Sequence, residues 1–358
     1  MTNAQQTAWQ PSSEFHRPLH AARSHCGSII ITFAFYRSPR VANPGLKLWP
    51  LVALPKRQEG LELRKQGELL YRVPLVGLER LVILGLAQVT TQALHQLSAK
   101  GIDVWYMTRT GKISFALRSP RSDNVFLRLA QAKCFFDREY TMAFARRIVR
   151  EKINRQIAFV KEHKFADAFD WRSRVEAMAS LQEHLEEQSA MDGIRGIEGS
   201  AGRIYFECFG AMLTKLSFSG RSRRPAQDEV NALLNLSYTF LCNECAAALE
   251  ICGLDTSLGF LHGVVYGRQS LALDFMEIYR ADATDRLVVR LVNWGMLNAQ
   301  SFQSDNQIGF RLTPEGFRTF IEQYEKHMTG DAGWRTRIRA DADALRRAIL
   351  EQKQWEVS

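Results

Sequence analysis

The chain has 358 residues, of which 46% are hydrophobic, so it can bury a sizeable core, and its length favours two domains over one. Lys and Arg outnumber Asp and Glu by 47 to 38, and the pI is near 9.3. Such a charge favours a polyanionic partner, because neutralising phosphates releases condensed counterions. No segment approaches the roughly 20 apolar residues that span a bilayer. No convincing secretory cleavage site follows residues 29–36, so we expect a cytoplasmic protein without a membrane partner.

Residues 1–48 mix polar residues, Pro and Gly with one isolated apolar run and show no sustained period. We expect these residues to be a disordered extension or the product of a misassigned translation start. No methionine follows Met1 until Met107, so an alternative start is not obvious from the sequence.

Residues 49–122 have the pattern of a small, mostly β domain. Short apolar runs are separated by turns that carry Gly or charged residues, with bends at Gly60 and Gly67. We expect strands at residues 51–54, 61–64, 69–74, 81–84, 102–107 and 113–117. Helical spacing at residues 90–99 ends at Gly101, the position of a helix C-cap glycine.

Residues 123–330 change to long amphipathic helices, for which residues 125–136, 137–163 and 172–188 are the clearest candidates. The absence of Pro between Pro120 and Pro225 permits uninterrupted helices. Residues 331–358 form a basic tail whose residues 335–354 also have a helical pattern. The predicted fold class is therefore α+β, with a small N-terminal mainly-β domain followed by a larger all-α domain.

The six cysteines do not form a disulfide framework, which favours a reducing compartment. They are Cys26, Cys134, Cys208, Cys242, Cys245 and Cys252. Cys242 and Cys245 have CxxC spacing, but they lie in an apolar helical run with no second CxxC and no paired His. Two small core residues one helical turn apart are the better interpretation, and a zinc or redox site is the alternative.

The first chemically informative segment is residues 195–203, where Glu198 is the one acid among tiny residues. Gly196, Gly199 and Gly202 leave little bulk around its carboxylate, which would let a substrate or another backbone approach closely. Close helix packing with an exposed Glu explains the same pattern equally well.

Two further segments add a histidine and two acids. His262 lies between an apolar run and Gly263, where a hydrogen-bonded structural His is more common than a ligand. Asp274 and Glu277 are spaced i,i+3 in an apolar helical segment, which places both carboxylates on one face. Buried acids require a partner or a metal, and a surface stripe beside Arg280 is the competing interpretation.

Together these segments offer two or three carboxylates and one imidazole. Hard oxygen ligands with a single nitrogen suit Mg²⁺ or Mn²⁺ better than Zn²⁺, and such an ion can polarise a phosphoryl oxygen or activate a hydroxyl. A loop between the segments holds Arg221, Arg223 and Arg224, and phosphate binding is the natural use of these residues. Asn231, at the start of the next helix, is a candidate to support a metal ligand by hydrogen bonding.

These motifs resemble one known family, the CRISPR-associated endonuclease Cas1, which is the integrase subunit of the spacer-acquisition complex. The matching stretches are IRGIEGSAGRIYF, FSGRSRRPAQDEVNALL and GLDTSLGFLHGVVYGRQSLALDFMEIYRADATDRLVVRLVN. Upstream, VPLVGLERLVILGLAQVTTQALHQLSAKGIDVWYMTRTGK resembles the family's amino-terminal β domain, and NVFLRLAQAKCFFD resembles the helix that opens its catalytic domain. The resemblance covers residues 52–320 in order.

By position, the resemblance implies that Glu198, His262 and Glu277 are the catalytic metal ligands for Mg²⁺ or Mn²⁺, with Asp274 as a further candidate. It implies a homodimer, dimerisation through the β domain, and a complex with Cas2. It also implies DNA as the partner, both protospacer and CRISPR repeat. The implied reaction joins the 3′-hydroxyl ends of short DNA to the CRISPR array by transesterification, and the same site cleaves DNA.

Two other functions share parts of this pattern. A catalytically silent DNA-binding scaffold would keep the Arg loop without an intact ligand set, and this sequence has all three ligands. A general repair nuclease would use the same chemistry on branched DNA and differs only in its substrate.

Overall fold

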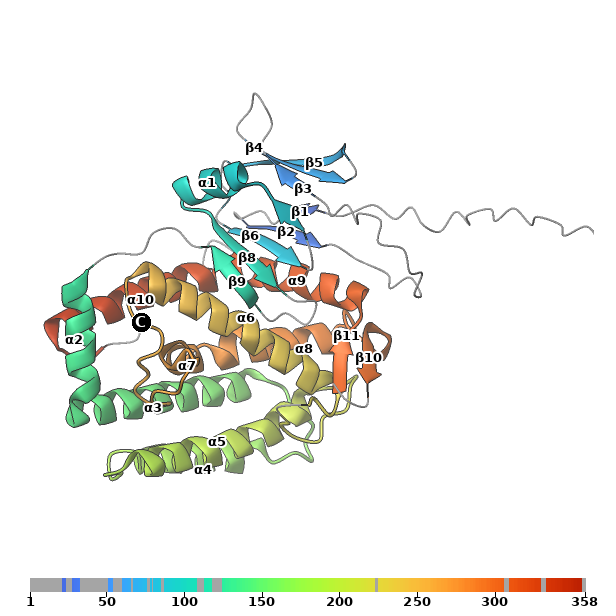
Figure 1. Cartoon of the computed structure of the whole chain (residues 1–358). Helices are drawn as coiled ribbons and strands as arrows, with labels where there is room; N and C mark the ends of the chain where they lie inside the picture. The colour runs from blue at the N-terminus through green and yellow to red at the C-terminus, as the bar shows by residue number, and fades with distance from the viewer. Residues whose placement is uncertain are drawn as a thin grey trace, which may run out of the picture.

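The computed structural model has a β region and a larger helical part (Figure 1). It describes residues 21–23, 28–32, 51–53, 60–65, 67–75, 78, 80–84, 87–107, 113–117, 124–222, 225–305, 309–329 and 333–355. The predicted α+β class, with a mainly-β N-terminal part followed by helices, is confirmed.

The β region contains two sheets and one helix. Its elements are β1 (Ala21–Arg23), β2 (Ser28–Thr32), β3 (Leu51–Ala53), β4 (Gly60–Lys65), β5 (Glu68–Pro74), β6 (Arg80–Leu84), β7 (Gln88–Val89), α1 (Thr91–Ala99), β8 (Asp103–Met107) and β9 (Ile113–Leu117). The strands lie in the orders β1-β2-β6-β8-β9 and β5-β4-β3-β7. The strands expected in this region are present, and Gly101 follows α1 with a φ of +71°, as expected of a C-cap glycine.

Alternation along β6 and β8 connects the five-stranded sheet to two cores. Leu81 and Ile83 of β6 and Val104 of β8 are buried in a small core with residues of β4, β5 and α1. Val82 and Trp105 point to the opposite face and are buried in the large core of the helical part. Strands β6 and β8 are thus buried on both faces, which is typical of strands in parallel sheets. Strand β6 pairs in parallel with both β2 and β8.

Residues 1–48 were expected to be a disordered extension or the product of a misassigned start, and one segment of them, Ser28–Thr32, forms a strand. This segment forms β2, which pairs in parallel with β6 and antiparallel with Ala21–Arg23. Three consecutive isoleucines give the segment a high β propensity, and the edge of β6 offers it backbone partners. The sheet therefore begins before residue 49, and the rest of residues 1–48 lies outside the described residues.

The helical part follows from residue 125 onward. Its elements are α2 (Val125–Phe136), α3 (Arg138–Glu162), α4 (Trp171–Glu183), α5 (Met191–Met212), α6 (Glu229–Ile251), α7 (Ser270–Glu277), the π-helical turn η2 (Arg280–Asp285), α8 (Arg286–Asn293), the 3-10 turn η3 (Ala299–Ser301), β10 (Phe302–Asp305), β11 (Gly309–Leu312), α9 (Pro314–Thr329) and α10 (Trp334–Glu351). The expected helices are present within a few residues of their predicted ends. The hairpin of β10 and β11 is an addition that the sequence patterns do not indicate.

Two arrangements among these helices position the candidate site. The central helix α6 contacts α7, η2 and α10, and most of its length is buried. The long helix α3 packs against both α5 and α7, so polar residues on these three helices can meet inside the protein (Figure 1). Within the described residues, no helix combines the length and the apolar character needed to cross a membrane.

The large core contains a buried ion-pair cluster that joins three helices. Arg335 of α10 lies 2.6 Å from Glu244 of α6 and 3.2 Å from Glu325 of α9, and its side chain is 6% exposed. We expect Arg335→Ala to lower the free energy of unfolding by about 3–5 kcal/mol, because it leaves uncompensated negative charge in the core. Chemical denaturation measures this loss. Arg347→Ala, which removes an exposed arginine from α10, should change stability by less than about 1 kcal/mol, and equal losses in the two variants would refute the prediction.

Candidate functional site

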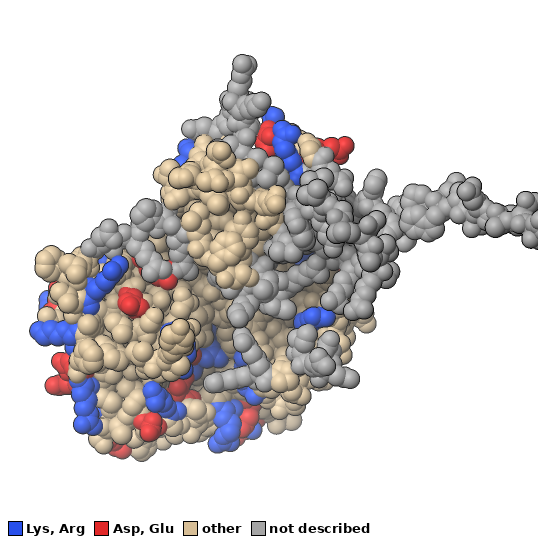
Figure 2. Space-filling view, viewed as in Figure 1, with Lys and Arg blue, Asp and Glu red and all other residues tan. Residues whose placement is uncertain are grey.

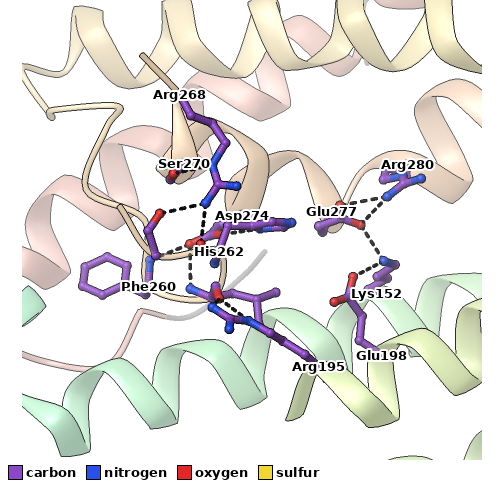
Figure 3. A network of polar contacts seen from close by, with 12 residues as sticks. Lys152, Arg195, Glu198, Phe260, His262, Arg268, Ser270, Asp274, Glu277 and Arg280 are labelled. Atoms are coloured by element: carbon purple, nitrogen blue, oxygen red, sulfur yellow. Dashed lines mark hydrogen bonds and ion pairs between the residues drawn. The ribbon is translucent and has the colours of Figure 1, made fainter. Parts of the chain in front are cut away.

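Three segments far apart in the sequence bring the predicted site residues together (Figure 3). Glu198 is on α5, Glu277 is the last residue of α7, and His262 lies in the connection between α6 and α7. Lys152 of α3, which the sequence analysis did not single out, lies between the two glutamates. Because α5 and α7 both pack on α3, the three helices hold these side chains in a fixed relation.

The ammonium group of Lys152 is shared by both glutamates. Its Nζ is 2.5 Å from Glu198 Oε1 and 2.7 Å from Glu277 Oε2. The side chain of Lys152 is 9% exposed, that of Glu277 is 3% exposed and that of Glu198 is 18% exposed. The two predicted acidic ligands are therefore within reach of one cationic group in a mostly buried place.

Arg280 holds the other side of Glu277. Its NH1 donates to both carboxylate oxygens, at 2.8 and 2.9 Å, and its guanidinium lies 4.0 Å from the ring centre of Tyr238. Burial raises the pKa of Glu277, but the charges of Arg280 and Lys152 outweigh burial and hold this pKa well below its ordinary value. Glu277 is therefore ionised at neutral pH in spite of its burial.

Asp274 anchors the connection that precedes α7. Its Oδ2 accepts hydrogen bonds from the backbone N–H groups of Phe260 (2.6 Å) and Leu261 (2.8 Å). Its Oδ1 accepts from the backbone N–H of His262 (3.0 Å) and from the ring Nδ1 of the same residue (2.6 Å). Both oxygens are thus used inside the protein, and the side chain has no exposed surface. These contacts support a positioning role for Asp274 and do not support the metal role considered for it above.

The bond to Asp274 determines which nitrogen of His262 carries the proton. A carboxylate only accepts, so Nδ1 donates, and the neutral ring keeps its lone pair on Nε2. Burial lowers the pKa of His262, but the hydrogen bond and charge of Asp274, with contributions from Glu277 and Glu198, outweigh it and raise the pKa. The side chain is 30% exposed, so the ring is accessible from outside.

Further contacts hold the connection around His262 in one shape. Arg195 of α5 donates two hydrogen bonds, at 2.7 and 3.1 Å, to the carbonyl of the residue before His262. Arg268 donates to the carbonyl of His262 itself at 2.6 Å. A Cβ on Gly259 would lie 2.5 Å from Cβ and 2.6 Å from the backbone carbon of Ser270, so a glycine is required where the connection passes the start of α7.

The glycines near Glu198 form an open surface of α5. A Cβ added at Gly196, Gly199 or Gly202 would meet no described atom within 4 Å. These glycines therefore do not serve close helix packing in the described structure, which was one of the two explanations for them. They leave room for a bulky substrate beside the Glu198 carboxylate.

Arg221 belongs to a separate cluster at the start of α6. Its guanidinium donates to the side-chain oxygens of Asn231 (2.8 Å) and Asn235 (2.7 Å), and it lies 5.4 Å from the ring centre of Tyr238. These contacts bind the Arg221 side chain into the protein. They differ from what we expected of a residue that contacts DNA directly.

Asn231 supports the arginine loop and not a metal ligand. It is fully buried, and it also accepts from the backbone N–H of Ser222 (2.9 Å) and donates to the carbonyl of Gly220 (2.9 Å). In the described structure it makes no hydrogen bond with Glu198, His262 or Glu277, so the expectation that it orients a ligand is corrected. The remaining arginines of the loop, Arg223 and Arg224, lie outside the described residues.

Cys242 and Cys245 are free thiols on α6. Burial raises the pKa of Cys242 to about 12 and that of Cys245 well above its ordinary value. A raised pKa disfavours the thiolate, which is the form that binds metals and reacts with disulfides. The two cysteines therefore behave as core residues, and the zinc or redox interpretation has no support from them.

The candidate ligands fit a hard divalent cation in their chemistry. Two carboxylates from different helices already direct oxygens at one cationic group, and the Nε2 lone pair of His262 is left for coordination. In the conformation described, which has Lys152 between the carboxylates, no three His, Cys, Asp or Glu side chains among the described residues are grouped so that they could hold a metal ion. Glu198, His262 and Glu277 are the residues that would hold one.

Comparison with known proteins identifies the family. The sequence profile of the family described as "CRISPR associated protein Cas1" matches residues 51–326. The chain belongs to the Cas1 family. A curated relative from Thermus thermophilus, "CRISPR-associated endonuclease Cas1 3", is 36% identical and aligns with 73% of this chain and 77% of its own length. Relatives named as endonucleases support nuclease activity for this Cas1 chain.

Two solved structures have the Cas1 fold seen here. A Cas1 protein from Thermotoga maritima superimposes with a TM-score of 0.74 at 23% identity, covering 86% of this chain and 97% of that one. A chain of a partial Cas6-RT-Cas1–Cas2 complex gives a TM-score of 0.64 at 26% identity, covering 87% of this chain and 96% of that one. The resemblance noted in the sequence motifs is thereby confirmed for the family and the fold.

Lys152 is a site residue of this Cas1 chain that sequence reasoning missed. A signal for it exists, because Lys152 lies four residues after Ile148 and four before Gln156, and all three are on the buried stripe of α3. A lysine on a buried stripe requires a buried negative partner. The sequence shows this signal only when the residues of α3 that face the core have been predicted correctly. It does not indicate which acid pairs with Lys152.

The hydrogen bond between Asp274 and His262 gives a testable shift of the His262 pKa. We expect Asp274→Asn to lower this pKa, because the negative charge that favours the protonated ring is lost while burial, which opposes it, stays. An NMR titration of the metal-free protein measures the pKa, with the resonance assigned by its absence in His262→Gln. Glu176→Gln on α4 removes an exposed acid and should leave the pKa unchanged. An unchanged or higher value in Asp274→Asn would disprove the assignment.

Proposed function

We propose that this Cas1 chain is a divalent-metal-dependent DNA endonuclease and integrase of CRISPR adaptation. The observation that carries the proposal is the meeting of Glu198 and Glu277, from two separate helices, at one cationic group, with His262 close enough for the charges of both acids to raise its pKa. In the proposed reaction, the 3′-hydroxyl ends of short protospacer DNA are joined to the CRISPR array by transesterification. With water as the nucleophile, the same site cleaves DNA.

In this proposal Glu198, Glu277 and His262 hold a Mg²⁺ or Mn²⁺ ion. When bound, the ion supplies Lewis acidity that polarises a phosphoryl oxygen and stabilises charge on the leaving group. Arg280 keeps Glu277 ionised and fixes the direction of its carboxylate. Asp274 keeps the ring of His262 oriented and its proton on Nδ1, so that Nε2 is available to coordinate.

The surroundings of the site support DNA as the substrate. The open glycine surface of α5 leaves room for a strand beside Glu198, and the net charge of +9 favours a polyanion. On the face drawn in Figure 2, Lys and Arg side chains are interspersed with Asp and Glu over the helical part. We therefore expect contacts to individual phosphates near the site and not one continuous basic band on that face.

The proposed protein partners are a second copy of this chain and Cas2. The solved complex that matches this chain at 26% identity names Cas2 together with Cas1. Dimerisation through the β region is supported by β5, an edge strand of the four-stranded sheet with exposed apolar side chains at Leu69, Leu70 and Tyr71. Edge strands that expose apolar residues readily pair with a second chain.

A strand-transfer assay tests the proposed function. We expect the purified chain, with Cas2 and Mn²⁺ or Mg²⁺, to join a labelled duplex to a plasmid that carries a repeat. Glu198→Ala and His262→Ala should each reduce joining by more than about 100-fold, because loss of a ligand should exceed the 10–100-fold effect of losing a residue that orients one. Glu207→Ala, which removes a more exposed acid from the same helix, should retain activity.

The other outcomes of this assay distinguish the alternatives. If the chain cleaves DNA in a reaction that depends on Glu198 and metal but does not join the duplex to the plasmid, the result would support a nuclease and would not support an integrase. A preference for branched DNA over array ends would favour a repair nuclease. A folded, DNA-binding wild type that neither joins nor cleaves in the presence of Cas2 would overturn the proposal in favour of a catalytically silent scaffold.

The arginine loop gives a second prediction, which separates DNA contact from structural support. Replacing Arg223 and Arg224 by Ala should weaken DNA binding and reduce the slope of log Kd against log salt by about 1 for each phosphate that is no longer neutralised. Arg221→Ala should instead lower the thermal midpoint, because its guanidinium bonds to Asn231 and Asn235. Fluorescence anisotropy at several salt concentrations and thermal unfolding measure the two effects. An unchanged slope in a folded double variant would remove the loop from the DNA interface.

A further inference from the structure

Lys152 places a positive charge at the point where the carboxylates of Glu198 and Glu277 meet. Its Nζ is within 2.7 Å of an oxygen of each acid. Its stem lies on the buried stripe of α3, so the core determines where the ammonium group can reach. Lys152 therefore belongs to the packed interior of the site and is not a surface charge that lies nearby.

The ammonium group and a divalent ion cannot use the same oxygens together. Carboxylate oxygens bind Mg²⁺ at about 2.0–2.1 Å, closer than they lie to Lys152 Nζ. Two cations on one pair of oxygens would be only a few ångströms apart, where like charges repel strongly in a poorly solvated site. Binding of the ion therefore requires the ammonium group to leave these oxygens.

Lys152 and Arg280, the two basic residues paired with Glu277, differ in whether they also contact Glu198. Arg280 pairs with both oxygens of Glu277 and not with Glu198, so it does not occupy the place between the two acids. Among the described residues, Lys152 is the cation that bridges both acids. The lysine stem is long and flexible, which lets the ammonium group turn away when its partners are taken by another cation.

We propose that Lys152 is a built-in competitor of the catalytic metal ion. This inference rests on the metal site of the proposed function. Without the ion, Lys152 neutralises Glu198 and Glu277 and keeps the carboxylates of α5 and α7 together, so the protein stays folded with its ligands in place. With the ion, Lys152 gives up both contacts. The residue thereby sets how much metal is needed to load the site.

Metal binding and stability of the full chain test this inference without reference to activity. Titration of the protein with Mn²⁺, following free Mn²⁺ by electron paramagnetic resonance, should show that Lys152→Met binds the ion at least about tenfold more tightly than the wild type, because the competing charge is gone. Lys152→Arg keeps the charge and should bind Mn²⁺ no more tightly than the wild type. Lys161→Met removes an exposed lysine from the same helix and should leave the affinity unchanged.

Thermal unfolding supplies the second measurement. In EDTA, Lys152→Met should unfold at a lower temperature than the wild type, because Glu198 has lost its cation, and saturating Mn²⁺ should raise its midpoint more than that of the wild type. Lys152→Gln is a milder variant with the same expected directions. If a variant is recovered folded only when Mn²⁺ is present during purification, that result also supports the inference.

Several results would overturn the inference that Lys152 competes with the metal ion. Equal or weaker Mn²⁺ binding by folded Lys152→Met and Lys152→Gln would show that the lysine does not compete, and so would variants that Mn²⁺ fails to stabilise. Failure of the proposed function looks different: wild-type Mn²⁺ binding would then be absent, or unaffected by Glu198→Gln. If Glu198→Gln weakens Mn²⁺ binding while Lys152→Met leaves it unchanged, the result supports the metal site and refutes only the competing role of Lys152.

Discussion

The burial of two carboxylates on α7 is the constraint around which the site is organised. Asp274 and Glu277 lie on one face of this helix, and both are almost without exposed surface. A carboxylate in such a place must be hydrogen-bonded or paired. Asp274 meets this requirement with backbone N–H groups and an imidazole, whereas Glu277 meets it with two cations. The partners come from α3, η2 and the connection before α7, so the two acids determine how these segments are arranged.

The two acids differ in what they leave available for chemistry. The oxygens of Asp274 are used by groups that cannot leave without unfolding the connection, so this residue gives His262 a fixed position. Glu277 is held by side chains, and Glu198 is paired through Lys152 and borders the open surface of α5. The site therefore has a rigid part, formed by backbone groups, Asp274 and His262, and an adjustable part, in which the ion pairs of Glu198 and Glu277 can be exchanged. Buried ion pairs contribute little to net stability, so a role in function explains the adjustable part better than a role in folding does.

The elements with a clear hydrophobic pattern were predictable from the sequence. Short apolar runs between turns identified β6 and β8, and three-and-four spacing placed α2 at residues 125–136. The parallel pairing of Ser28–Thr32 with β6 was not predictable, because strand propensity does not say which distant strand becomes the neighbour. The β10–β11 hairpin was missed because its short segments carry mixed polar and apolar residues without a clear alternation.

The sequence indicated which residues form the candidate site, but not which side chains contact one another there. Spacing and family resemblance indicated Glu198, His262 and Glu277, but their convergence depends on how α5 and α7 pack on α3. Lys152 was hidden among the many charged residues of α3, since only burial distinguishes it from its neighbours. Asn231 was expected to support a metal ligand, and its observed partners are in the neighbouring arginine loop, because a position at the start of a helix does not say which donors and acceptors the side chain will meet.

Charge balance shows how the proposed ion and the protein's own cations can replace one another. Six groups that ionise form two sets of contacts in the site. Lys152 and Arg280 pair with the carboxylates of Glu198 and Glu277, and His262 pairs with the carboxylate of Asp274. When His262 is protonated, three positive groups face three negative ones. On the proposed function, a divalent ion brings two charges, Lys152 leaves the carboxylates, and His262 must be neutral to coordinate. The same three carboxylates are then balanced by Arg280 and the ion. A site that exchanges one ammonium group and one proton for one divalent ion keeps its buried charge constant, so neither state leaves a carboxylate unpaired in the core.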